Sequence, residues 1–141
     1  MQRGRRIAFD YGDVRIGVAV SDADSILCSP LTTLKTADKD LSPHIAQILL
    51  DIEPVVIFVG RPSLLSGADG AATQKALGFV EQLGQLTSVR IELVDERMST
   101  VSAARNLREA GRNAKDAKES IDMAAAVAIL EFAIAIEKAR P

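Results

Sequence analysis

Cysteine and histidine are nearly absent from this sequence of 141 residues, which contains one of each, Cys28 and His44. One cysteine cannot form an internal disulfide or a thiolate metal centre, and one histidine cannot build a histidine-rich metal site. We therefore expect Cys28 to be a small packing residue and His44 to be a surface residue. Aromatic residues make up 4% of the chain and tryptophan is missing, which argues against a base-stacking surface.

The start of the sequence lacks an apolar leader with a small-residue cleavage site, so we expect a cytoplasmic protein with no membrane partner. An excess of one charge is also lacking, because 17 basic side chains face 19 acidic ones. A nucleic-acid partner would therefore meet a local basic surface. The candidates are an N-terminal cluster of Arg3, Arg5, Arg6 and Arg15, and the range 97–118, although both are also typical of ordinary solvated surface.

Length and composition favour one compact domain spanning residues 1–141, because 48% hydrophobic residues suffice for its core. Apolar runs and turn residues predict strands at 6–9, 15–20, 31–34, 55–59 and 89–94. They predict helices from Ser42 to Pro54, over 72–86, from Ser99 or Thr100 to a break at 111–113, and from Ser120 onward. This order predicts an α/β fold with a mixed five-stranded sheet, in which an antiparallel hairpin adjoins parallel strands flanked by helices.

Acidic residues follow two of the predicted strands. Asp10 comes after the first strand and Glu96 after the last, and the helical crossovers between them make these strands parallel, so both acids lie at one edge of the sheet. Gly60 and Pro62 end the strand at 55–59 and lie at the same edge. A third acid, Asp122, lies near the start of a final helix that is apolar nearly all round and must be largely buried.

A carboxylate buried beside other carboxylates is costly unless a cation neutralises it. Asp10, Glu96 and Asp122 therefore predict an oxygen-only site for Mg²⁺ or Mn²⁺. Two such ions, about 3.5–4 Å apart and bridged by a carboxylate, activate water and stabilise the leaving oxygen in phosphodiester cleavage. We expect Asp10 to be the bridging ligand.

Each acid also has a plain structural interpretation. Asp122 suits the positive end of a helix that begins at Ser120. Asp10 suits the turn that contains Gly12, and Glu96 suits a solvated ion pair with Arg97. The sequence features taken one at a time leave both interpretations open.

Four sequence blocks resemble one known family, the YqgF/RuvX family of pre-16S rRNA nucleases, also described as Holliday-junction-resolvase-like proteins. The similarity runs from about Arg5 to Glu137. In order, the blocks are Phe9-Asp10-Tyr11-Gly12 with Arg15-Ile16-Gly17-Val18-Ala19-Val20-Ser21-Asp22, Val59-Gly60-Arg61-Pro62, Asp95-Glu96-Arg97-Met98-Ser99-Thr100, and Ser120-Ile121-Asp122-Met123-Ala124-Ala125.

The resemblance implies an RNase H-like fold and a divalent-metal-dependent nuclease that trims the 5′ end of precursor 16S rRNA. The acidic positions of the family fall on Asp10, Glu96 and Asp122. Arg15 and Arg97 lie within the motifs, where they contact phosphate, orient the acids or form structural ion pairs. Gly60, Pro62 and Thr100 also lie within the motifs, and we expect them at the substrate. The loop Ser63–Gly67 departs from the family pattern, because it lacks the usual Asn and Asp.

Three other functions stay open from the sequence. A four-way DNA junction is the rival substrate, and a resolvase would benefit from a two-fold dimer, although no oligomer signal is present. The hairpin around Gly12 and Gly17 also resembles the phosphate-binding hairpin of actin-like ATPases, but these need two such domains. A non-catalytic nucleic-acid-binding module would have no need for all three acids.

Overall fold

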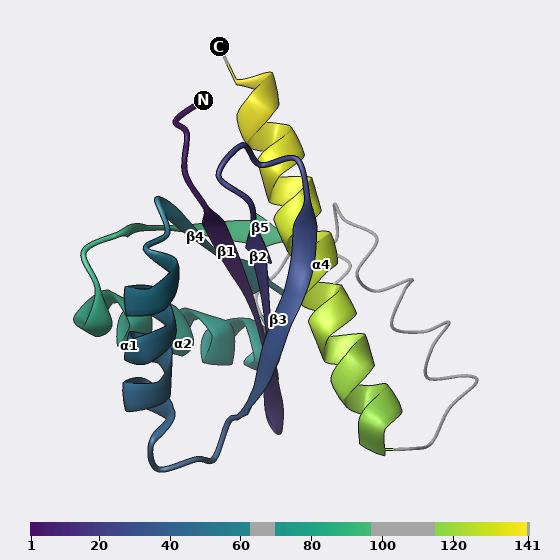
Figure 1. Cartoon of the computed structure of the whole chain (residues 1–141). Coiled ribbons are helices and arrows are strands. Elements are labelled where there is room, and N and C mark those ends of the chain that lie inside the picture. Colours follow the sequence, from purple (N-terminus) through teal and green to yellow (C-terminus); the bar gives the residue numbers. More distant parts are fainter. Residues whose placement is uncertain (63–69, 97–114, 141) are drawn as a thin grey trace.

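Five strands form one mixed sheet in the order β3-β2-β1-β4-β5 in the computed structural model, which describes residues 1–62, 70–96 and 115–140 (Figure 1). Strand β1 pairs antiparallel with β2 and parallel with β4, while β3 extends the antiparallel side and β5 the parallel side. The predicted mixed α/β sheet is therefore confirmed. The strands are β1 (Arg6–Tyr11), β2 (Arg15–Ser21), β3 (Cys28–Lys35), β4 (Val56–Arg61) and β5 (Arg90–Asp95).

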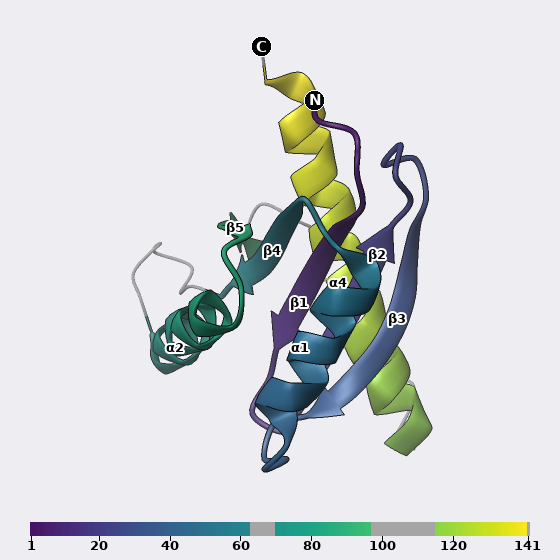
Figure 2. The same cartoon turned by 60° about the vertical axis from the view of Figure 1, so that its left-hand side comes forward.

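Helices cover both faces of the sheet. Helices α1 (Leu41–Ile52) and α2 (Ala71–Leu86) lie on one face, and α4 (Lys115–Ala139) lies on the other (Figure 2). Side chains along β1 point alternately to the two faces of the sheet, which explains why both faces are covered. Ile7 and Phe9 pack toward α1 and α2, whereas Ala8 packs toward α4. No described helix has the length and apolar character needed to cross a membrane.

Two predicted helix starts are wrong. Helix α1 begins at Leu41, and Ser42 does not cap it, because its hydroxyl accepts a hydrogen bond from Gln82 of α2 at 2.9 Å. Helix α4 begins at Lys115 instead of Ser120, because Lys115 to Glu119 are compatible with a helix and no residue there stops it. The predicted break at 111–113 lies outside the described residues.

The final helix is also less buried than its composition predicts. Ala126, Ile129 and Leu130 are fully buried against the sheet, but Glu131 and Ile136 are exposed. Asp122 is half-buried. Helix α4 therefore packs on the sheet with one side and leaves apolar side chains such as Ile136 exposed on the other.

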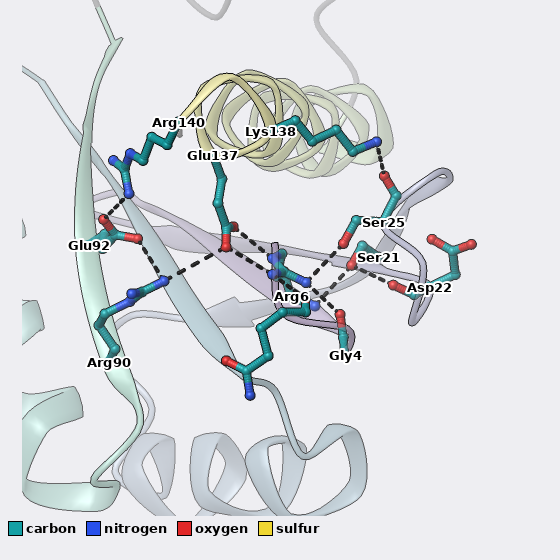
Figure 3. A network of polar contacts seen from close by, with 11 residues as sticks. Gly4, Arg6, Ser21, Asp22, Ser25, Arg90, Glu92, Glu137, Lys138 and Arg140 are labelled. Carbon is teal, nitrogen blue, oxygen red and sulfur yellow. Dashed lines mark hydrogen bonds and ion pairs between the residues drawn. The ribbon is translucent and has the colours of Figure 1, made fainter.

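The four N-terminal arginines differ in how far the fold leaves them exposed. Arg6 is fully buried and pairs with Glu137 of α4, with 2.7 Å between Nε and Oε1 (Figure 3). Arg3 pairs with Asp24, and the half-buried Arg5 donates to the carbonyl of Ser21. Burial removes Arg6 from any nucleic-acid surface, whereas Arg3 and Arg15 keep part of their side chains exposed. Within the range 97–118, residues 97–114 lie outside the described part of the chain.

Candidate active site

Asp10 lies near the carboxyl end of β1 and is almost completely buried, with 3% of its surface exposed. Alternation places its side chain on the same face as Ala8, which packs against α4. Asp10 is paired directly with Gly17 of β2, and directly opposed residues in an antiparallel pair project on the same face. The carboxylate therefore lies on the α4 side of the sheet, beside a position with no side chain.

Gly17 allows α4 to approach the sheet at this point. A Cβ atom at position 17 would overlap the backbone carbonyl oxygen of Asp122. Only glycine allows the helix backbone to lie this close to β2. Asp122, which is 112 positions after Asp10 in the chain, is thereby brought next to the residue that pairs with Asp10.

Glu96 directly follows β5 and is also buried, with 6% exposed. A Cβ atom at Gly60 would lie 2.7 Å from its Oε1 atom, so the carboxylate occupies the space above Gly60. Strand β1 pairs with β4 through Phe9 and Val59, and the next residues in this register are Asp10 and Gly60. The two buried carboxylates therefore come from β1 and the end of β5, on either side of β4.

Asp122 is held by a cation of the protein. Its Oδ2 atom accepts a hydrogen bond from Nε of Arg15 at 2.9 Å, and both side chains are about one-fifth exposed. Because α4 starts at Lys115, Asp122 lies two turns inside the helix and has no helix N-terminus to stabilise. The capping interpretation of Asp122 is wrong, and its partner is the arginine of the first motif.

The donor chemistry of this end of the sheet fits a hard divalent cation. Carboxylate oxygens are the ligands that Mg²⁺ prefers, and the absence of a side chain at Gly17 and Gly60 lets Asp122 and Glu96 approach the sheet here. In the described part of the chain, however, no three acidic, histidine or cysteine side chains come close enough together to hold a metal ion. Asp10 and Glu96 each have an electrostatic or polar interaction, and Asp122 is engaged by Arg15.

Of the remaining predicted site residues, the structure describes Pro62 but not Arg97 or Thr100. Pro62 follows β4 at the same end of the sheet, and its carbonyl accepts a hydrogen bond from the buried Thr73 hydroxyl, which ties β4 to α2. Arg97, Thr100 and the loop Ser63–Gly67 lie outside the described residues. The close approach of α4 at Gly17 was missed from the sequence, although an isolated glycine inside an apolar strand is a signal of close backbone approach.

Cys28 and His44 lie away from these acids. Burial raises the pKa of the Cys28 thiol to about 11, with the charge of Glu131 adding to the effect, so it is not a thiolate at neutral pH. Cys28 packs beside the α4 core, as predicted. His44 is exposed and pairs with Asp38 at 3.2 Å.

The sheet order, with helices on both faces, defines the class of protein by its fold, which is RNase H-like. The structure is similar to RuvC of Thermus thermophilus in complex with a Holliday junction substrate, with a TM-score of 0.60 and 15% identity over 96% of both chains. A second T. thermophilus RuvC structure gives a TM-score of 0.57 at 16% identity, over 95% of this chain and 96% of the other. This similarity establishes the fold.

Sequence comparison then identifies the family. Residues 4–135 match the RuvX family, described as Holliday junction resolvase. The chain is 41% identical to a Streptomyces coelicolor protein over 98% of this chain and 84% of the relative. It is 46% identical to a Nocardia farcinica protein over 92% and 76%, and both relatives carry the name "Putative pre-16S rRNA nuclease". The chain belongs to the RuvX family and is a hydrolase that acts on nucleic acid, as the sequence motifs predict.

Proposed function

We propose that residues 1–141 form one Mg²⁺- or Mn²⁺-dependent endonuclease domain that cuts precursor 16S rRNA near its 5′ end, in the cytoplasm. The observation that carries the proposal is the placement of two buried carboxylates, Asp10 and Glu96, at one end of one face of the sheet. Family membership and the names of the relatives support an rRNA substrate. The substrate is free precursor rRNA or the ribosomal particle that contains it.

Asp10, Glu96 and Asp122 are the residues that would hold the cations. One or two divalent cations, when bound, supply a water of lowered pKa and positive charge for the leaving oxygen. Burial keeps Asp10 and Glu96 out of bulk solvent, which strengthens their attraction for a cation. Holding a cation would engage the Asp122 carboxylate, which here accepts a hydrogen bond from Arg15, and the arginine would then be available to a phosphate of the substrate.

The substrate side of the site comes from the same motifs. We assign phosphate contacts to Arg15 and Arg97, and backbone or hydroxyl contacts to Gly60, Pro62 and Thr100. Arginine suits this role because its planar guanidinium donates two parallel hydrogen bonds to phosphate oxygens.

A four-way DNA junction is the second candidate substrate, favoured by the description of the family as Holliday junction resolvase. The test is a cleavage assay on a precursor 16S rRNA fragment beside a synthetic four-way junction, with Mg²⁺, Mn²⁺ or a chelator. Metal-dependent cutting of the RNA alone supports the proposal. Symmetric cutting of the junction alone contradicts it in favour of a resolvase, which would act as a dimer. Binding of RNA with no cutting under any condition indicates a non-catalytic module.

A further inference from the structure

A cavity of about 510 Å³ opens beside the Arg15–Asp122 pair, at the edge of the sheet formed by β2 and β3. It is lined by the turn before β2 and by the end of β3: Asp13, Val14, Arg15, Thr33, Leu34, Lys35 and Ala37. Arg15 pairs directly with Lys35, and Gly17 pairs with Thr33, so these side chains lie on the face that carries Asp10. The cavity is therefore joined to the acid-bearing end of the sheet by Arg15, which lines the cavity and hydrogen-bonds to Asp122.

Two cations lie side by side in the lining of this cavity. Directly opposed like charges destabilise a sheet, yet Arg15 and Lys35 occupy such a pair of positions. Arg15 is balanced by Asp122, and Asp13 is balanced by Lys75 at 2.8 Å. Lys35 is exposed and has no ion-pair partner among the described residues. An anion between Arg15 and Lys35 would remove the repulsion.

The walls of the cavity suit more than a bare anion. Val14 is 65% exposed, so an apolar side chain borders the two cations, whereas Leu34 packs toward α1 and α2 on the other face of the sheet. Thr33 adds a hydroxyl that can donate or accept a hydrogen bond. A ribose or base against the apolar wall, with its phosphate between the cations, matches this chemistry, and the volume is adequate for one nucleotide.

We propose that this cavity binds one nucleotide of the substrate strand flanking the bond that is cut, with Lys35 contacting its phosphate. The inference rests on the proposed nuclease function and deepens it, because it assigns to the β2–β3 edge a contact outside the four sequence motifs. Lys35 acts on substrate affinity and not on the chemical step. Its removal therefore raises KM and leaves kcat unchanged.

The test compares Lys35→Gln with Lys39→Gln, which removes the same charge from an exposed lysine that does not line the cavity. Binding of a labelled single-stranded RNA that spans the precursor–mature boundary is measured in chelator over a range of salt. We expect Lys35→Gln to weaken binding about five- to tenfold and to reduce the slope of log K against log salt by about 0.7, the value for one single-strand phosphate contact. Lys39→Gln should bind as the wild type does.

The melting temperature separates a binding role from a structural one. Lys35→Gln removes an unfavourable charge pair, so the free protein should melt no lower than the wild type. RNA binding equal to the wild type in both variants would overturn the inference. An equal weakening of RNA binding in both variants would overturn it as well, and either result would leave the proposed nuclease function intact. A wild-type protein that neither binds nor cuts the RNA would overturn the proposed function itself.

Discussion

The carboxylate of Glu96 occupies the space that a side chain at position 60 would fill. A Cβ atom there would lie 2.7 Å from Glu96 Oε1 and 2.6 Å from Ile129 Cδ1, both at the ends of side chains that can move. We therefore expect Gly60→Ala to fold with little loss of stability but to displace the carboxylate. Misplacement by about 1 Å can reduce a rate about 100-fold, and a cleavage assay with a thermal melt measures both effects.

Gly84→Ala is the matched control, because a Cβ atom at Gly84 of α2 meets nothing within 4 Å. Alanine inside a helix is about 0.5–1 kcal/mol more stable than glycine, so this variant should melt higher and cut at the wild-type rate. Unchanged cleavage by Gly60→Ala as well would show that the Glu96 carboxylate does not need its present position.

The sequence predicted which acidic residues belong to the candidate site, but it did not predict which side chains form ion pairs with them. Asp10 and Glu96 follow apolar strands, and a carboxylate at a strand end is legible from sequence. The ion pair between Arg15 and Asp122 is not, because it depends on how closely α4 approaches β2. Lys35 was missed because its position opposite Arg15 depends on the β2–β3 register.

Helix α4 and strand β2 meet through Gly17, where the helix backbone contacts the sheet. The atom that a side chain at position 17 would meet is a backbone oxygen, which cannot move without moving the helix. We therefore expect Gly17→Ala to lower the free energy of unfolding by about 1–3 kcal/mol and also to abolish activity. Urea unfolding measures the first effect, and a stability equal to the wild type would contradict the close approach.

Strands and helices could be predicted where apolar or β-branched residues recur at a regular spacing. The exact first residue of a helix could not. The mixed sheet follows from apolar runs joined by a short turn on one side and by helical crossovers on the other. The starts of α1 and α4 were misplaced because Ser42 and Ser120 are good capping residues that here lie inside helices. In α1, tertiary contact with Gln82 uses the hydroxyl that local chemistry would have assigned to a cap.

At the scale of the whole molecule, a polar network joins the two ends of the chain. The buried Arg6 donates to both carboxylate oxygens of Glu137, to the carbonyls of Gln2 and Gly4, and to the Ser25 hydroxyl (Figure 3). Arg90 of β5 also pairs with Glu137, at 3.8 Å. This network fastens the C-terminal part of α4 to the sheet, at the end opposite the acids.

Replacing Glu137 with Gln should cost roughly 3 kcal/mol, because it leaves the Arg6 charge buried without its counter-ion. The Arg6 guanidinium hydrogen-bonds to Glu137 and holds the pKa of this carboxyl below its ordinary value of 4.5. A depressed carboxyl pKa stabilises the fold above about pH 4.5 and loses that contribution as the pH falls through the folded value.

The stability of the wild type should therefore fall more steeply than that of Glu137→Gln as the pH is lowered from neutral to below 4.5. Denaturant unfolding at a series of pH values measures both curves. Curves that stay parallel over this range would contradict the assignment of acid sensitivity to Glu137.

The central claim is that the carboxylates at one end of the sheet perform metal-dependent hydrolysis, and Asp10→Asn tests it most directly. The amide keeps the shape of the side chain and removes the charge that would hold a cation. We predict that the variant melts close to the wild type and has no metal-dependent cleavage of the precursor 16S rRNA fragment. A folded variant that cuts at the wild-type rate would contradict the claim.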